Sequence, residues 1–135
     1  MIAEVYDFTL MPPMPKEEAD ALNRSLALRE LFQLARANPD LSFVFAPEGR
    51  DFPGGVLGEP AEGFGRFIYE FSHLGFLVMP VGIFEEKGSL ILNIGEPFAL
   101  TAEKDIEKHQ VDEKINLKIM TTIARLLPSH LRGKY

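Results

Sequence analysis

The residues whose chemistry is most suited to binding a ligand lie in one short segment, 47–55, with the sequence PEGRDFPGG. It combines two carboxylates, one guanidinium and three glycines: Glu48, Asp51, Arg50, Gly49, Gly54 and Gly55. The planar fork of Arg50 suits bidentate binding of a phosphate or a carboxylate. Glycines let backbone N–H groups approach an anion closely. Two interpretations stay open, an anion-binding loop and a surface loop in which Glu48 and Arg50 pair with little effect on stability.

If the segment binds a ligand, three roles are open for Glu48. Its carboxylate could align Arg50, accept a hydrogen bond from a substrate hydroxyl, or do neither. The composition of the loop does not decide between them, so both Glu48 and Arg50 are retained as candidate binding residues.

Other kinds of catalytic site are missing from the sequence. The absence of cysteine excludes thiol nucleophiles and zinc-thiolate sites. The three histidines, His73, His109 and His130, are too far apart for a metal motif. There is no Gly-x-Ser-x-Gly elbow, no P-loop and no dense cluster of carboxylates. We therefore predict no catalytic residue, no metal site and no cofactor, and a structural or surface role for each histidine.

Charge is distributed unevenly along the chain. The net charge is -6, yet no acidic residue follows Glu113. The acidic body lacks the basic face that nucleic-acid binding requires, which argues against a nucleic-acid partner. The tail carries cations and leucines, namely Arg125, Leu126, Leu127, His130, Leu131, Arg132 and Lys134. This pattern favours a solvated helix end, and the alternative is weak, reversible contact with an anionic membrane surface.

The sequence contains no recognisable targeting or membrane-spanning segment. Glu4 and Asp7 stand where a signal peptide needs a basic region. The longest apolar run, 74–84, is interrupted by glycine and proline and is too short to cross a bilayer. These features predict a cytoplasmic protein, with the inner membrane surface as a second location if the tail contacts lipid.

The elements that must position the 47–55 segment are predicted from periodicity. Alternation or short apolar runs predict strands at 2–10, 41–46, 76–84 and 89–94, the last two joined by a four-residue turn at 85–88. Helical spacing of apolar residues predicts helices at 16–37, 59–73 and 105–127. The expected fold is a single α/β domain over 1–135, with helices packed on a mixed, mostly parallel sheet in the order β-α-β-α-β-β-α. In such sheets ligands bind beyond the carboxyl ends of strands, where the 47–55 segment would lie.

Several blocks of the chain resemble the glycerol-3-phosphate and lysophosphatidic acid (1-acylglycerol-3-phosphate) acyltransferase superfamily. FAPEGR at 45–50 resembles its Phe-Pro-Glu-Gly-Thr-Arg block, with one residue dropped before Arg50 and an alanine before the proline. VMPVGI at 78–83 resembles its Val-Pro-Val strand, and LNIGEPF at 92–98 resembles its Ile-Gly-Glu-Pro turn. IARLLP at 123–128 and RGKY at 132–135 resemble its usual ending. The resemblance covers about residues 23–135, in the family's order, and so corresponds to the C-terminal part of that domain.

The resemblance implies a role in phospholipid biosynthesis. It implies that Glu48 and Gly49 line the site of the acceptor, a glycerol phosphate or lysophospholipid, and that Arg50 binds its phosphate. The dropped residue leaves the direction of Arg50 open. Pro80 would shape the wall of an acyl or acceptor pocket, or simply bend a buried strand. The acyl donor would be an acyl-CoA or acyl-carrier-protein thioester.

The family's catalytic His-x-x-x-x-Asp pair is missing from this chain. In that pair the histidine takes the proton of the acceptor hydroxyl while the aspartate orients the imidazole. Here Val78, Lys114 and Tyr135 stand five residues after the three histidines. Only His73 lies near the blocks that resemble the family and is a candidate for a substitute base.

Three hypotheses follow from this partial resemblance. The chain could be the truncated part of an acyltransferase whose histidine half lies upstream or on a separate chain, and so be inactive alone. It could be a non-catalytic module that binds phosphate or lipid. It could also be a homo-oligomeric interaction module.

Overall fold

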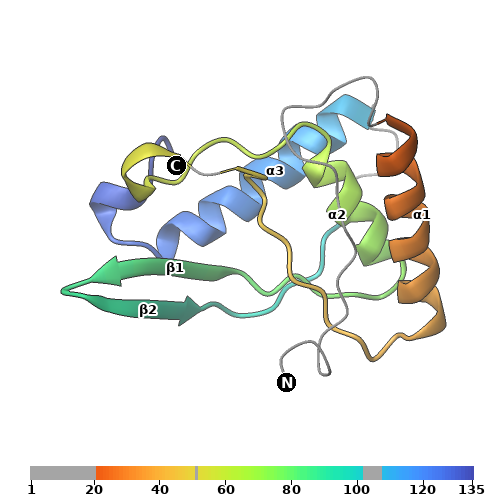
Figure 1. Ribbon diagram of the computed structural model, residues 1–135, viewed down its shortest axis with the longest axis horizontal. Helices are drawn as coiled ribbons and strands as arrows, with labels where there is room; N and C mark the ends of the chain where they lie inside the picture. The colour runs from red at the N-terminus through yellow and green to blue at the C-terminus, as the bar shows by residue number, and fades with distance from the viewer. Residues whose placement is uncertain (1–20, 51, 102–107) are drawn as a thin grey trace. The chain divides into compact units, whose positions relative to one another are not determined.

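The computed structural model describes residues 21–50, 52–101 and 108–135 (Figure 1). The chain divides into two compact units, Met1–Ser42 and Phe43–Tyr135. The first unit contains helix α1 (Ala21–Ala37). The elements of the second are the 3-10 helix η3 (Pro53–Gly55), α2 (Phe64–His73), β1 (Val81–Glu86), β2 (Ser89–Ile94), α3 (Lys108–Arg125) and the 3-10 helix η4 (Ser129–Leu131).

The predicted sheet is wrong. In the described residues the only sheet has two antiparallel strands, β1 and β2, and most of the regular structure is helical. The order β-α-β-α-β-β-α and the mixed, mostly parallel sheet are therefore not found. The predicted strand 2–10 lies outside the described residues.

Segment 41–46 shows why the prediction failed. It is extended but belongs to no strand of the described sheet. Phe45 packs edge-on against two rings of α2, with centroids 5.1 Å from Phe67 and 5.4 Å from Phe71. Between the phenylalanines, Val44 is 97% exposed. One side of this apolar segment, with Phe45, thus packs on α2, and the other side, with Val44, is exposed to solvent.

Proline limits pairing in the second predicted strand. The prediction placed a strand at 76–84, but β1 begins only after Pro80. Proline has no N–H to donate to a ladder. Upstream of it the chain makes a single isolated bridge, in which the backbone N–H groups of Val78 and Phe98 each donate to the other's carbonyl at 2.9 Å.

Helix α1 agrees with its predicted 3.6-residue periodicity. Ala27, Leu31 and Ala35 are buried and recur at every fourth position. The helix ends at Ala37, and the side-chain nitrogen of the next residue, Asn38, donates to the Leu34 carbonyl at 3.2 Å. The predicted helix 16–37 is confirmed over the described positions 21–37.

Helix α3 carries the core of the second unit. Its predicted range, 105–127, is observed as 108–125, and residues 102–107 are outside the described part. Ile115 and Ile119 pack with Ile68 of α2, while Met120 and Ala124 pack in a second cluster with Leu57. The α3 helix therefore lies along both α2 and β1 (Figure 1).

Helix α2 is capped by a side chain of α3. Gly63 at its N-cap position has no side chain to cap it and has φ 81°. The carboxylate of Asp112 replaces such a cap, accepting hydrogen bonds from the N–H of Gly63 at 3.2 Å and from that of Arg66 at 2.8 Å. A β-carbon at buried Gly65 would overlap with the Asp112 carbonyl. Gly65 is therefore a site of close packing between α2 and α3.

The β1–β2 hairpin is confirmed, with a shorter turn than predicted. Glu86 pairs with Ser89, so the turn consists of Lys87 and Gly88, with φ 52° and 75°. Both φ values are positive, as a two-residue hairpin turn requires. β1 consequently extends two residues closer to the turn than predicted, while β2 begins at Ser89 as predicted.

The two faces of the hairpin differ in burial. On one face Gly82 packs on Leu126, and Asn93 donates to the Leu126 carbonyl at 2.8 Å. On the opposite face Ile83 and its cross-strand partner Leu92 are 58% and 55% exposed. We call the second surface the open sheet face; its exposed aliphatic members are Ile83, Leu90, Leu92 and Ile94. Successive strand residues point to opposite faces, so α3 covers only one of them.

Candidate functional site

The loop that carries Glu48, Gly49 and Arg50 is a compact turn with internal hydrogen bonds. Gly49 has φ 63°, a conformation that favours glycine, and its N–H donates to the Ala46 carbonyl at 3.3 Å. The Pro47 carbonyl accepts a hydrogen bond from Ala61 at 2.8 Å. The Glu48 carboxylate holds the chain beyond the loop at Gly58, because it accepts a hydrogen bond from the Gly58 N–H at 2.5 Å.

This hydrogen bond assigns a role to Glu48. Its Oε1 closes the loop between residues 48 and 58, an interaction that the three roles considered from sequence did not include. No ion pair between Glu48 and Arg50 is found in the described part of the chain. The surface pairing considered as the alternative is therefore not observed.

Arg50 is supported by an aromatic ring. Its guanidinium carbon lies 4.7 Å from the centre of the Phe52 ring, within the range of a cation–π interaction. The Phe52 ring in turn packs over Gly58, where a β-carbon would overlap with it. Arg50 itself is exposed, and within the described residues its charge faces no carboxylate at ion-pair distance. Its guanidinium N–H groups are therefore available to an anion from solvent.

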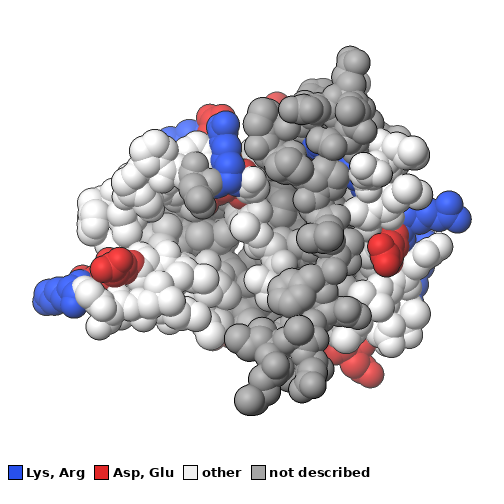
Figure 2. Space-filling view, viewed as in Figure 1, with Lys and Arg blue, Asp and Glu red and all other residues white. Residues whose placement is uncertain are grey.

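The C-terminal segment joins the same loop from far along the chain. Leu57 donates its N–H to the Leu131 carbonyl at 2.8 Å. Gly133 lies against the Leu57 carbonyl, where a β-carbon would overlap with the oxygen. Lys134 Nζ lies 2.7 Å from Glu59 Oε1, across 75 residues of sequence. In Figure 1 the C-terminus accordingly lies beside the segment that follows η3, and in Figure 2 basic and acidic side chains gather there.

The charges of this region shift one another's pKa. The hydrogen bond and positive charge of Lys134 lower the pKa of Glu59 below 4.5, and Arg50 adds to the effect. The same hydrogen bond raises the pKa of Lys134 above 10.5. Burial raises the pKa of Tyr135, and the nearby carboxylates of Glu59 and Glu48 add to that shift. The contribution of the Glu59 carboxylate to stability is present above pH 4.5 and is lost as pH falls through the lowered pKa of Glu59. The contribution of the Lys134 ammonium group to stability is lost as pH rises through the raised pKa of Lys134.

Pro80, the fourth predicted site residue, is buried at the start of the hairpin. Its carbonyl accepts the N–H of Gly95 at 2.9 Å, and its ring lies where a β-carbon of Gly95 would be 2.9 Å away. These contacts give Pro80 a packing role. Its predicted part in an acyl or acceptor pocket stays a prediction.

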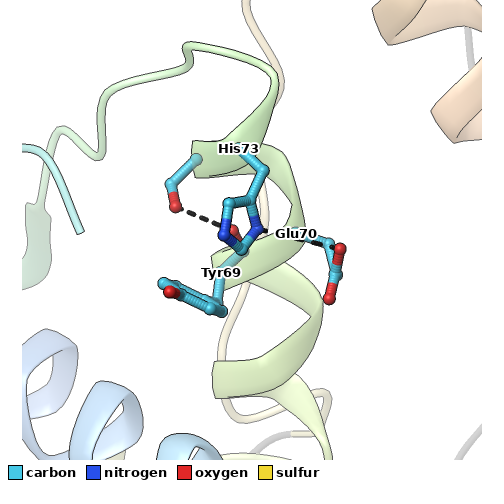
Figure 3. Close-up of polar contacts among 4 residues, drawn as sticks. Tyr69, Glu70 and His73 are labelled. Atoms are coloured by element: carbon cyan, nitrogen blue, oxygen red, sulfur yellow. Dashed lines mark hydrogen bonds and ion pairs between the residues drawn. The ribbon is translucent and has the colours of Figure 1, made fainter. Parts of the chain in front are cut away.

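His73 is not brought to the loop. It is the last residue of α2, whereas Ala61, which bonds to Pro47, lies just before the first turn of that helix. A helix rises about 1.5 Å per residue, so the length of α2 separates His73 from the loop by roughly 14 Å. His73 is 56% exposed, with Nδ1 3.8 Å from Glu70 and its ring 4.4 Å from that of Tyr69 (Figure 3). His73 is thus exposed on the surface, and both its predicted structural or surface role and the alternative of a substitute base stay predictions.

His130 does not enter the loop's contacts either. His130 is exposed in η4, and the side chain of His109 lies outside the described part. Over the described ranges, no group of three or more His, Asp or Glu side chains could hold a metal ion. No described helix is long and apolar enough to cross a membrane.

The residues that sequence reasoning missed are Gly58, Glu59, Lys134 and Tyr135. Gly58 and Glu59 follow the predicted loop closely, but nothing in their spacing predicts a hydrogen bond to Glu48. Lys134 belongs to the predicted basic tail, and both Lys134 and Tyr135 belong to the RGKY block that resembles the family's ending. The signal that could have found them is the RGKY ending, taken as a family block and not as part of a site.

Comparisons of the chain with protein-family models, curated proteins and solved structures gave no match. The acyltransferase resemblance consequently remains a prediction that rests on the blocks quoted above.

Proposed function

We propose that this chain binds the phosphate group of a glycerolipid acceptor and is the acceptor-binding part of an acyltransferase-like domain. The observation that carries the proposal is Arg50. Its exposed guanidinium lies over the Phe52 ring, in a loop closed by Glu48. An arginine held in this way loses little conformational freedom when it binds an anion, which favours binding.

The chemistry of the loop favours phosphate over other ligands. An arginine fork forms two parallel hydrogen bonds with a phosphate. Gly49, Gly54 and Gly55 all have positive φ, and the side chains they lack leave backbone groups accessible near the loop. The glycerol part of the ligand is inferred from the resemblance of FAPEGR to the acyltransferase block.

The chain is proposed to be inactive alone. Acyl transfer needs a base within hydrogen-bond reach of the acceptor hydroxyl. His73 lies at the opposite end of α2 from the loop, and Glu48 Oε1 already accepts the Gly58 N–H. The histidine that takes the acceptor proton would come from another polypeptide segment, and the acyl-CoA or acyl-carrier-protein thioester would bind to that assembled domain.

The open sheet face is the surface on which that histidine-bearing polypeptide would pack. Its aliphatic side chains form a row along β1 and β2, and exposed acids stand near both ends of the hairpin: Glu85 on the same face as the row, Glu86 on the opposite face at the tip, and Glu96 after β2. In the view of Figure 2, charged side chains stand at the hairpin tip while the rest of the hairpin is uncharged. With these three acids against the single cation Lys87 of the turn, the charge near the ends of the row is net negative, which favours a polypeptide with basic flanks over an anionic lipid surface.

A homo-oligomer is the second candidate, and the same open sheet face favours it. Light scattering separates the two. A stable dimer at low micromolar concentration supports self-association, whereas a monomer leaves the face available to a different chain and excludes the oligomeric module.

We also place the chain at the cytoplasmic side of the inner membrane, where glycerolipid acceptors would be found. Contact of the tail with lipid would be weak, because Lys134 already binds Glu59 and the Nε of Arg132 donates to the Leu127 carbonyl. Sedimentation with anionic vesicles tests this location, and equal recovery of the chain with neutral and anionic vesicles would argue against a charge-driven contact.

Thermal unfolding tests the proposed ligand. Glycerol 3-phosphate and lysophosphatidate should raise the melting temperature, because a ligand that binds only the folded state stabilises it. Glycerol alone should have no such effect, and Arg50→Ala should remove the shift. A flat response to both phosphate compounds, with coenzyme A also inert, would reject the proposal.

A further inference from the structure

Two cations act on one exposed carboxylate beside the Arg50 loop. Lys134 Nζ lies 2.7 Å from Glu59 Oε1. Arg50 is linked to the same place by packing, since its guanidinium lies over Phe52, and Phe52 packs on Gly58, the residue before Glu59. The positive charge of Arg50, after that of Lys134, also lowers the pKa of Glu59.

We propose that Lys134 is a second ligand of the phosphate bound by Arg50, and that Glu59 is the counter-ion that the phosphate displaces. The proposal rests on the proposed function, because it needs Arg50 to bind phosphate. The class of ligand it specifies is a phosphate monoester, whose second negative charge matches a second cation.

Exposure of the ion pair makes the exchange favourable. The side chains of Lys134 and Glu59 are 62% and 68% exposed, and ion pairs in solvent contribute little to stability. A phosphate monoester carries between −1.5 and −2 charges at pH 7 and about three strong acceptor oxygens. It can therefore accept hydrogen bonds from Arg50 and Lys134 together. The Glu59 carboxylate carries a single charge and binds the two cations less strongly.

The residues on either side of Lys134 hold it near the loop. Leu131 and Tyr135 pack against the core cluster that contains Leu57, and the Leu131 carbonyl accepts the Leu57 N–H. Gly133 approaches the Leu57 carbonyl closely. The backbone of Lys134 is therefore fixed, while its long side chain can turn from Glu59 to a ligand.

Calorimetric titration of the full chain with glycerol 3-phosphate tests the proposal. Lys134→Met should weaken binding about tenfold, as expected for one lost charge-assisted hydrogen bond. Glu59→Gln should strengthen binding, because the competing carboxylate is removed. The matched controls are Lys87→Met at the hairpin tip and Glu96→Gln after β2, which make the same charge changes and should leave the affinity unchanged. Lys134→Met binding as tightly as Lys87→Met would overturn the role of Lys134.

A phosphate diester extends the test to ligand class. Glycerophosphocholine, which has one phosphate charge and a choline cation, should bind at least tenfold more weakly than glycerol 3-phosphate to the unsubstituted chain. The difference should shrink in Lys134→Met. Equal affinities for the two ligands would contradict a two-cation site.

The outcomes separate this proposal from the one on which it rests. Loss of binding in Arg50→Gln with full binding in Lys134→Met rejects only the second ligand. Absence of binding in the unsubstituted chain rejects both. A direct readout is the NMR signal of the Lys134 ammonium group, which should move on addition of glycerol 3-phosphate; binding that leaves this signal unchanged also rejects the exchange. Urea unfolding of Lys134→Met should match the unsubstituted chain, because the ion pair is exposed.

Discussion

Gly58 connects the main contacts of the candidate site. Its N–H donates to Glu48, and its missing side chain leaves room for the ring of Phe52, on which Arg50 rests. A glycine followed by a glutamate is common in loops, so neither residue stands out in the sequence. What sequence reasoning predicted here was the chemistry of Arg50; the residues that hold it depend on a tertiary arrangement that spacing does not encode.

Gly58→Ala should therefore weaken the binding of glycerol 3-phosphate. The added methyl group overlaps with Phe52, and overpacking of this kind typically costs about 1–3 kcal/mol. The control is Gly75→Ala, where a β-carbon meets nothing but the backbone has φ 94°. That substitution should reduce the free energy of unfolding by roughly 1 kcal/mol without changing the affinity. Equal affinity in Gly58→Ala and the unsubstituted chain would show that the ring does not position Arg50.

At the scale of elements, helices were predicted well and the sheet was not. The recurrence of Ile115 and Ile119 reports directly which face of α3 is buried, because helical periodicity is local. Strand pairing is not local. The run LSFVFA at 41–46 has the composition of a buried strand, yet Phe45 packs on α2 and Val44 points to solvent. Composition does not distinguish these two ways of accommodating an apolar segment.

The contact between α2 and α3 yields a prediction on stability. Asp112→Ala should lower the free energy of unfolding by about 1 kcal/mol, because two N–H groups at the start of α2 lose their acceptor. Asp112→Asn keeps one carbonyl oxygen and should cost less. Glu113→Ala, a neighbouring exposed position, is the control for loss of an acid from α3. Urea unfolding measures all three, and equal losses in Asp112→Ala and Glu113→Ala would contradict the capping role.

At the scale of the whole molecule, the second unit leaves an aliphatic surface uncovered. Ile83 is 58% exposed on the open sheet face, while its neighbour Phe84 packs against the core cluster on the opposite side. An exposed apolar surface of this kind is typical of a binding or assembly interface. The sequence could not predict it, because an apolar residue in a strand is expected to be buried.

Substitution of these two neighbours tests the difference between the faces. Ile83→Lys should change the free energy of unfolding by less than about 0.5 kcal/mol and reduce binding of a hydrophobic dye. Phe84→Lys should destabilise the fold by about 3 kcal/mol or more, since it removes a packed ring and introduces a charge. Similar losses of stability in both variants would show that the open sheet face is covered within the chain.

The central claim is that Arg50 binds a phosphate group, and an equilibrium titration with glycerol 3-phosphate tests it most directly. The unsubstituted chain should give a saturable signal, and Arg50→Gln, which keeps a polar side chain but is shorter and carries no charge, should abolish it. The urea unfolding curves of the two proteins should coincide, since Arg50 is exposed. Equal affinity for glycerol 3-phosphate in both proteins would contradict the account.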